Sequence, residues 1–598
     1  MARKERPQPE PVAPMTRKRV WLLAAAFLLI GIAVIPGAAS PFREPKSVLT
    51  VGAILVVAGL SLTGAFVRGR VAVRCSALAL VLVSLPALQA LSAWWADSPR
   101  LAITASAQTA VWVLGALWIA TTSDTERRRL IAAAAIGAAA SSTVLILQAG
   151  GWAVLGLDRE AGPERLVLTG LTGNPADLAM TAVLVLPLVI TGIGTAGSCW
   201  PRRLLAGLLS VAVVVSQTLT GVIALVLVWA VWLVQQRSRR LWLGAAVAAA
   251  VVLVAGLATG LDQRIERQLW RLRHGDWYFL LSARSDGWTA AADMTRSHPL
   301  TGVGAGNFTH AYYPSRVAWV ERTGVAGHRS ELATHFDLAH CDPLQMVAEL
   351  GIPGLLWMAA LVFVLVRDRP RGDPLPPMAA AAFVPFAALH FPTHLAVGLV
   401  PLILILGHVL AGSREIVLEP APWLGRTAAA LVAIAVVIGS YWQLQRLTLD
   451  VWRGGLRYDL TAAERLEGAA RAQQAALVEA QILPRLPALA GSRSWLWRLV
   501  GRARLLREDD VGAETAFRNA MTLWPHEEAE FGLGLALAAQ GDRTAAAGLD
   551  EGNRRGEAIL HLTRVCRTNP ALIKLIPDPE LRNAVTDIVR AAERIPDR

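Results

Sequence analysis

The residues best suited to chemistry are a histidine and two carboxylates at the start of a long apolar run. His340, Asp342 and Glu349 fall within ten residues, and the apolar run continues to about residue 366. An imidazole near its ordinary pKa accepts a hydroxyl proton at neutral pH, and a nearby carboxylate can orient or polarise it. The alternative is that His340 only caps the helix that follows. The sequence therefore predicts polar chemistry at the mouth of a helix long enough to cross a bilayer.

An arginine upstream is the second candidate. Arg284 lies in the segment Trp277–Ser297, which we predict to be a single helix, close to Asp286 and Trp288. The planar fork of a guanidinium matches two phosphate oxygens, so Arg284 could hold a phosphate. An ordinary Arg–Asp surface pair is the alternative.

Two further patterns are better explained by a structural role of their residues than by a role in catalysis or binding. The glycines of Gly302-x-Gly304-x-Gly306 lack the preceding strand of a phosphate-binding loop, so a tight turn between helices is the better interpretation. His390 and His394 follow a later apolar segment. They either line the same cavity as His340 or simply sit at the membrane boundary, and we favour the second.

A metal site is a weaker interpretation. His335, Asp337, His340, Cys341 and Asp342 together could hold an ion, but their spacing fits no standard zinc pattern. We therefore expect no metal and no other cofactor.

Composition indicates that a membrane bundle positions these residues. Of 598 residues, 54% are hydrophobic and 17% are charged, below the quarter that is usual in soluble domains. The apolar residues form about thirteen runs of membrane-crossing length. These lie near 20–38, 48–66, 73–92, 101–121, 130–149, 176–194, 203–217, 220–236, 241–260, 344–366, 378–392, 395–411 and 427–445.

Arginine placement predicts the orientation. The N-terminus and every second loop are basic, which is typical of cytoplasmic segments. The long loop 261–343 and the chain after 445 would then lie outside the cytoplasm. The net charge of +13 needs no nucleic acid, because anionic lipid headgroups suit orienting arginines.

The chain divides into five predicted parts. We expect an all-α polytopic bundle of about 12–13 spans with a soluble helical-repeat tail. Residues 1–19 form a basic cytoplasmic N-terminus, 20–260 a first membrane block, 261–343 a long outer loop, 344–445 a second membrane block and 446–598 a soluble outer domain. Within the loop, Asp262–Arg273 has helical spacing with a basic face, so it could lie on the membrane surface.

The tail carries a repeat-like pattern. Small and aromatic residues at Ala513, Ala516, Phe517 and Ala520 resemble the second helix of a tetratricopeptide repeat, with its partner near 494–507. A further pair, Glu528–Gln540 and Arg543–Arg555, would follow. Stacked repeats usually bind proteins, so a protein partner is expected here, and a plain helical bundle is the alternative.

The segment from Arg284 to Gly354 resembles the signature region of the O-antigen ligase and O-antigen polymerase superfamily. The resemblance rests on the arginine-bearing helix, on His298-Pro299-Leu300-Thr301-Gly302-Val303-Gly304-Ala305-Gly306-Asn307-Phe308, and on His340-Cys341 followed after nine residues by Gly351-Ile352-Pro353-Gly354. Gly170-Leu171-Thr172-Gly173-Asn174-Pro175 is similar to a further family element. Two positions depart from the family pattern: Cys341 replaces an asparagine, and Thr218–Gly221 lacks the family's mid-chain arginine.

The resemblance implies a glycosyltransferase of the bacterial inner membrane that takes a glycan from undecaprenyl diphosphate. The outer side would then be the periplasm, with 261–343 as a periplasmic catalytic loop and 446–598 as a periplasmic domain. Its donor would be the lipid-linked glycan and its acceptor a hydroxyl of a lipid or glycan, with membrane lipids as neighbours. Arg284 would bind the diphosphate and His340 would orient or deprotonate the acceptor, in a metal-independent inverting displacement. Asp342, Glu349 and Asn307 would contribute to substrate binding.

Other functions remain open at this stage. A ligase for lipopolysaccharide, a polymerase and a protein glycosyltransferase share these motifs. A transporter or flippase would need ionisable residues at mid-membrane or broken symmetric helices, which the sequence does not indicate. A non-enzymatic membrane scaffold is the remaining class.

Overall fold

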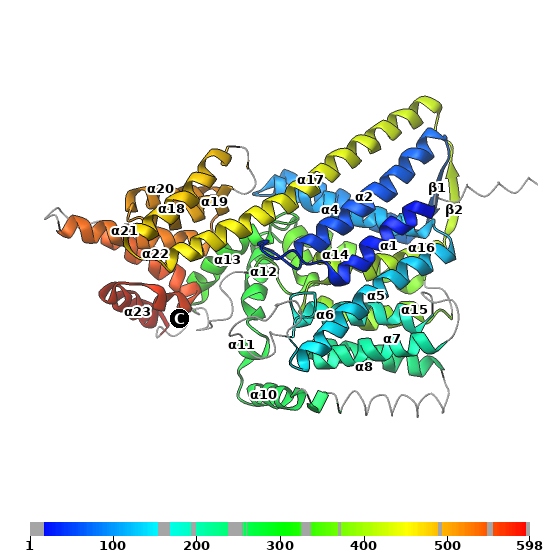
Figure 1. The fold of residues 1–598 in the computed structure, drawn as a ribbon, viewed down its shortest axis with the longest axis horizontal. Coiled ribbons are helices and arrows are strands. Elements are labelled where there is room, and N and C mark those ends of the chain that lie inside the picture. The colour runs from blue at the N-terminus through cyan, green and yellow to red at the C-terminus, as the bar shows by residue number, and fades with distance from the viewer. Residues whose placement is uncertain are drawn as a thin grey trace, which may run out of the picture.

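The computed structural model describes residues 17–152, 168–192, 199–236, 254, 256–258, 260–324, 336–368, 372–487, 489, 493–546 and 554–593. Within them the chain is an all-α bundle with one two-stranded sheet, which confirms the predicted fold class (Figure 1). The sheet lies at one end of the bundle, called the sheet end below. The long loop and the C-terminal helices lie at the other, called the loop end.

Helices occupy every predicted span that falls within the described residues. Seven are long and apolar enough to cross a membrane: α2 (Glu44–Val67), α3 (Ala77–Leu91) with the short helix after it, α4 (Pro99–Ala120), α5 (Asp124–Ala149), α8 (Leu219–Gln236), α14 (Asp342–Arg367) and α17 (Pro422–Glu464). Shorter apolar helices are α6 (Pro175–Ile190), α15 (Leu375–Leu389) and α16 (Ala396–Ala411). The other spans correspond to α1 (Arg17–Ile32) and α7 (Cys199–Val215), while most of 241–260 lies outside the described residues.

The remaining elements belong to the loop, the tail and short connections. They are η1 (Ser92–Trp94), α10 (Leu261–Arg273), α11 (Trp277–Leu280), α12 (Arg284–Ser297), α13 (Phe308–Thr323), η3 (Pro392–His394), α18 (Gly468–Ile482), η4 (Leu483–Arg485), α19 (Arg493–Leu506), α20 (Asp510–Leu523), α21 (Glu527–Ala546), α22 (Arg554–Thr568), η5 (Pro570–Leu575) and α23 (Pro579–Glu593).

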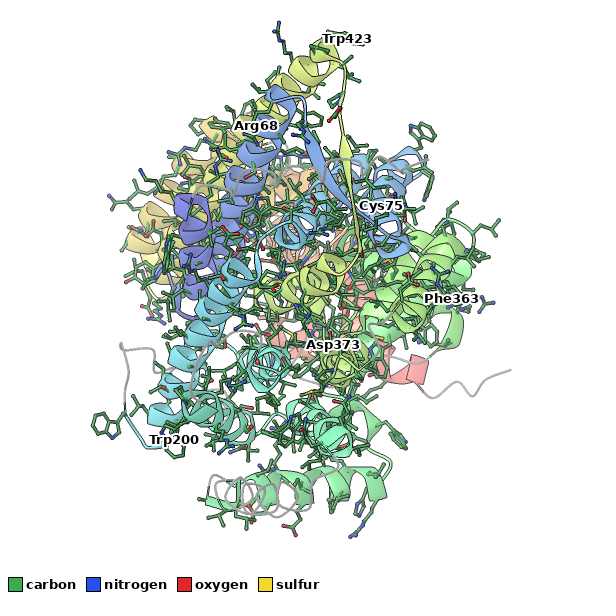
Figure 2. All side chains as sticks on the ribbon, turned by 90° about the vertical axis from the view of Figure 1, so that its right-hand side faces the viewer. Arg68, Cys75, Trp200, Phe363, Asp373 and Trp423 are labelled. Atoms are coloured by element: carbon green, nitrogen blue, oxygen red, sulfur yellow. The ribbon has the colours of Figure 1, made fainter. Side chains whose placement is uncertain are left out.

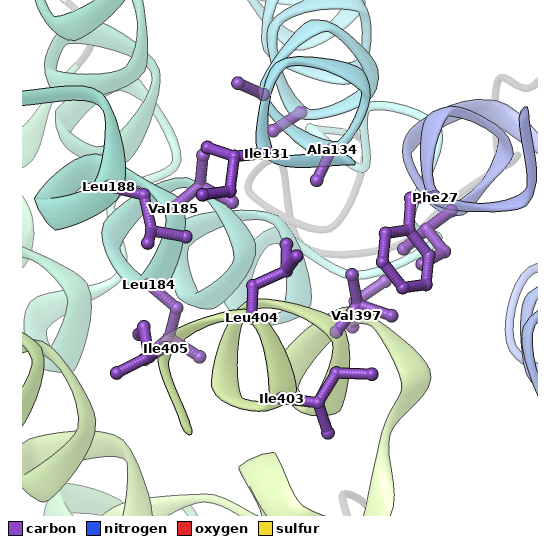
Figure 3. Close-up of a cluster of buried hydrophobic side chains, with 14 of the residues drawn as sticks. Phe27, Ile131, Ala134, Leu184, Val185, Leu188, Val397, Ile403, Leu404 and Ile405 are labelled. Atoms are coloured by element: carbon purple, nitrogen blue, oxygen red, sulfur yellow. The ribbon is translucent and has the colours of Figure 1, made fainter. Parts of the chain in front are cut away.

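The bundle core is apolar and closely packed. Phe27 of α1, Ile131 of α5, Leu184 of α6 and Leu404 of α16 all point into one cluster (Figure 3). Where α1 crosses α5, a Cβ added at Gly31 would lie 1.9 Å from a backbone oxygen of the facing helix. Small residues of this kind let membrane helices approach to backbone contact.

The sheet was not predicted. β1 (Val71–Cys75) pairs antiparallel with β2 (Arg414–Leu418). The prediction that a membrane span begins near residue 73 is therefore wrong. The helix begins at Ala77, where the Ser76 hydroxyl accepts a hydrogen bond of 3.2 Å from the amide of Ala79.

The long loop differs from the prediction at one point. The helix α10 forms as expected, but the single helix predicted over 277–297 is wrong, because Ser282 and Ala283 take left-handed φ angles of 55° and 63°. The chain therefore turns between α11 and α12, and this turn determines where Arg284 begins its helix.

The tail stacks as successive antiparallel helices. Phe517 of α20 lies between Gly501 of α19 and Gly532 of α21, where an added Cβ would come within 2.7 Å and 2.3 Å of its ring. The helix predicted at Arg543–Arg555 is wrong in its bounds, since α21 continues to Ala546 and the next helix begins at Arg554. The predicted boundary at residue 446 falls inside α17, so this helix connects the bundle to the tail without a break.

Candidate active site

His340 lies at the loop end of the bundle, two residues before α14. Its ring makes edge contacts with Phe336 and Phe391 at centroid distances of 5.0 and 4.7 Å. Its Nδ1 lies 3.1 Å from the carbonyl oxygen of Leu338, which fixes the tautomer: Nδ1 donates this hydrogen bond and Nε2 keeps its lone pair. A φ of 56° is unusual for a residue with a side chain and is typical of positions that the surroundings force.

Burial and positive neighbours lower the pKa of His340 to about 3. Burial is the larger cause, and the charge of Arg284 is the next. The imidazole is therefore neutral at neutral pH, so it can accept a proton but is a weak base while no anion is nearby.

Arg284 begins α12 and has no carboxylate partner among the residues that the structure describes. Its Nη1 donates to the Leu281 carbonyl at 3.3 Å, and its buried Nε donates to nothing described. Asp286, the partner suggested by the sequence, instead forms an ion pair of 3.1 Å with Arg316. The alternative of an Arg284–Asp286 pair is therefore not realised.

Asp342 and Glu349 belong to a hydrogen-bond network that holds the His340 segment in place. Asp342 accepts from the Thr393 amide at 3.1 Å and lies 3.1 Å from Nδ1 of His394. Gln345 accepts from the Ala339 amide at 3.0 Å and donates to Glu349 at 3.0 Å. These contacts fix α14 to the turn after α15.

Glu349 and Asn307 also hold the glycine turn. Glu349 accepts a hydrogen bond of 2.7 Å from the Gly306 amide, and Asn307, 1% exposed, accepts from the Ser98 amide at 3.0 Å. A Cβ at Gly302 would lie 2.3 Å from the Glu349 backbone, so the turn touches α14 directly. The interpretation of these glycines as a tight turn is confirmed. The predicted substrate contacts of Asp342, Glu349 and Asn307 stay predictions, and their observed contacts suit positioning.

A second polar group lies next to His340, and the sequence analysis named its histidine, His390, but missed its other members, Asp177 and Arg43. The ring of His390 lies 6.2 Å from that of His340, and its Nε2 donates to Asp177 at 2.9 Å. Arg43 donates to the other oxygen of Asp177 at 3.0 Å and lies over the Phe391 ring. The signal for Asp177 was a lone aspartate early in an otherwise apolar helix, two residues after the Asn174-Pro175 motif.

His394 and Cys341 complete the surroundings. His394 belongs to the Asp342 network, and His390 to the group beside His340, so both contact the candidate site rather than only the membrane boundary. Burial raises the pKa of the Cys341 thiol, which therefore stays protonated. The described residues contain no group of three or more His, Cys, Asp or Glu side chains arranged for a metal, and His335 lies outside them.

The region of the candidate site also matches a known protein family. Residues 204–359 match the family described as O-antigen ligase, a stretch that includes Arg284, the glycine turn and His340. No match is found among curated proteins. Thr218, where the family pattern has an arginine nearby, is buried. This match and the motif around His340 support a similarity of this region to the O-antigen ligase superfamily.

Proposed function

We propose that the protein transfers a glycan from undecaprenyl diphosphate to an acceptor hydroxyl, as an inner-membrane O-antigen ligase. The observation that carries the proposal is the pairing of a neutral imidazole, His340, with a nearby guanidinium, Arg284, that has no carboxylate partner among the described residues. An unpaired buried cation suits an anionic ligand, and a free imidazole lone pair suits a hydroxyl.

The reaction would be a single displacement. The acceptor oxygen attacks the anomeric carbon, the bond from that carbon to the phosphate oxygen breaks, and the electron pair leaves with the diphosphate. Nε2 of His340 takes the hydroxyl proton. Arg284 balances the negative charge that develops on the leaving group, which is electrostatic stabilisation of the transition state. Attack from the opposite face inverts the anomeric centre.

Donor binding would also activate the base. The charge of Arg284 is one cause of the low pKa of His340. A diphosphate bound at Arg284 offsets that charge, so the pKa of His340 rises when the donor is present. His340 would thus become a stronger base only when a leaving group is in place.

The contacts between segments support the proposal, made from the arginine pattern, of which segments lie on each side of the membrane. The loop helices and the tail share one buried cluster, so both lie on one side, here assigned to the periplasm. The arginine-flanked segments 71–75 and 414–418 pair at the opposite end, here assigned to the cytoplasm.

The test replaces His340 with alanine in the full chain, in a strain lacking the native protein. Surface glycan is separated by electrophoresis, and His298→Ala is the matched control because His298 is an exposed histidine of the same loop. We expect the control to restore the glycan and His340→Ala to fail although it is inserted at a normal level. Full restoration by His340→Ala would refute the proposal. Loss of the whole ladder indicates a ligase, whereas single-unit caps indicate a polymerase.

A further inference from the structure

The helix α10 carries a row of arginines that nothing in the described structure neutralises. Arg264, Arg267 and Arg271 are spaced three and four residues apart, so they share one face of the helix. No carboxylate among the described residues forms an ion pair with any of them. Arg271 is held by the Phe279 carbonyl at 3.2 Å and by the ring of the same residue. Three positive charges on one face without counter-ions indicate an anionic ligand.

Unpartnered donors mark where the ligand would lie. The buried Nε of Arg264, the buried Nε of Arg284 and the buried indole nitrogen of Trp288 have no hydrogen-bond partner among the described residues. Trp288 lies four residues after Arg284, so the two share a face of α12. A buried donor without a partner costs about 1–3 kcal/mol, and an anionic ligand bound at these side chains would satisfy the donors.

The charge of Arg284 connects α10 to the candidate active site. Burial and, to a smaller extent, the charges of Arg267, Arg271 and Arg284 lower the pKa of Arg264 to about 10. Arg284 acts in the same way on His340. Arg284 is therefore close enough to influence both Arg264 and His340 electrostatically.

The opposite side of α10 suits a lipid chain. Ile265, Leu269 and Trp270 are 41%, 46% and 56% exposed. They line a groove of about 620 Å³, whose other lining residues are Leu257, Leu261, Asp262, Glu266 and Arg273. The helix runs across the direction of the spans, which are seen nearly end-on in Figure 2, so one face can meet acyl chains while the other meets phosphates.

We propose that α10 is the docking site for the lipid-linked donor: its groove receives the polyprenyl chain, and Arg264, Arg267 and Arg271 receive the diphosphate and pass it to Arg284. The proposal rests on the proposed function, because it names where that donor enters. A guanidinium fork suits a diphosphate better than an ammonium, since it offers paired donors to two oxygens.

Binding of undecaprenyl diphosphate to the full chain in nanodiscs of neutral lipid tests the proposal. We expect Arg264→Gln to weaken binding at least tenfold and Arg264→Lys to weaken it less. Arg296→Gln is the control, because this exposed arginine of α12 lies outside both the groove and the arginine row, and the variant should bind within twofold of the unchanged protein. Thermal unfolding serves as the folding check, and Arg264→Gln should not lower the midpoint, because it removes a buried charge that has no partner.

Two results would overturn the proposal. One is unchanged binding by Arg264→Gln. The other is equal competition by phosphatidylglycerol, which would make the row a site for bulk anionic lipid. Failure of the proposed function is distinguishable, because His340→Ala should still bind undecaprenyl diphosphate. Binding that depends on Arg264 in a protein without transferase activity would leave the docking site in place and remove only the reaction.

Discussion

At the scale of single residues, the candidate site depends on backbone positions that few residue types tolerate. Gly302 has a φ of 65° and touches the Glu349 backbone, while Gly351 interrupts α14 with a φ of 60° and faces the Leu300 carbonyl. These two glycines let the backbone of the glycine turn, which precedes α13, pack closely against the backbone of α14 where that helix bends. The hydrogen bond from Gly306 to Glu349 depends on that fit.

Gly302→Ala should therefore lower the free energy of unfolding by about 3 kcal/mol, because left-handed strain adds to a clash with backbone atoms. Gly275→Ala is the control: its φ is 68°, but no atom lies within 4 Å of an added Cβ, so only about 1 kcal/mol of strain is expected. Thermal unfolding in detergent measures both. Equal midpoints for the two variants would contradict the role given to the contact.

The low pKa of His340 predicts an acid-sensitive fold. In the unfolded chain the imidazole binds a proton below pH 6.5, whereas in the folded chain it does so only near pH 3. The stability that this residue contributes is thus complete above pH 6.5 and is lost as the pH falls toward 3. At pH 5 the loss amounts to about 2 kcal/mol. His340→Gln should lose less stability than the unchanged protein between pH 7 and pH 5, measured by unfolding midpoints. Parallel pH profiles would contradict this.

Single-residue chemistry was only partly predictable from the sequence. His340 stands out because a polar residue beside an apolar run needs a reason, and Arg284 because a guanidinium suits a phosphate. The Asp177–His390 contact could not be predicted, since 213 residues separate its members and nothing local relates them. The Arg284–Asp286 pair failed because Arg316, on another helix, takes the carboxylate.

At the scale of elements, α17 is the longest helix and connects the bundle to the tail. It packs along α2, and near its loop-end part Asp450 accepts a hydrogen bond of 3.0 Å from the Ser40 amide. Beside this contact an added Cβ at Gly454 would lie 1.9 Å from the Gly37 oxygen, whereas one at Gly455 would meet nothing. Two adjacent glycines of one helix therefore have opposite surroundings.

Alanine at these glycines should act with opposite signs. Gly454→Ala should lower the free energy of unfolding by about 2 kcal/mol through the clash with the α1–α2 connection. Gly455→Ala should raise it by up to about 1 kcal/mol, because alanine favours the helix over glycine. Thermal unfolding of the two variants tests the prediction. A change of the same sign in the stability of both variants would show that α17 does not pack closely at Gly454.

Secondary-structure elements were predictable from the sequence where hydropathy alone determines their position. Runs of apolar residues identified the described spans because the bilayer length fixes the pattern. The sheet was missed because each strand is five residues long and its partner is remote, and the break before α12 was missed because Ser282 and Ala283 are not turn-forming types at positive φ.

At the scale of the whole molecule, the tail and the long loop form one packed body. Phe308 and Tyr312 of the loop share a buried cluster with Phe517, Leu533 and Leu562 of the tail. Within it, Glu530 accepts from the Tyr313 hydroxyl, lies 2.9 Å from Nδ1 of His561 and accepts from Arg564 at 3.3 Å. Burial and this carboxylate raise the pKa of Tyr313 well above its usual value, so the phenol remains a donor.

Glu530→Ala should therefore loosen the tail from the loop at a cost of about 2 kcal/mol, since a buried phenol loses its charged acceptor. Limited proteolysis of the purified protein should cut faster within the tail. Glu580→Ala is the control, because that carboxylate is 86% exposed and its ion pair with Arg555 contributes little. Equal cleavage rates for both variants would mean that Glu530 does not hold the tail.

The pairing of β1 with β2 has a consequence for the order of biosynthesis. Arg74, in β1, donates to the Ser413 carbonyl, and 339 residues separate them. At a synthesis rate of about 5–20 residues per second, the first strand waits roughly 20–70 s for its partner to leave the ribosome. During that time it is an open edge that another chain could pair with. Chaperones or the insertion machinery must then shield this edge, and a ribosome stalled before residue 414 leaves a nascent chain prone to aggregation.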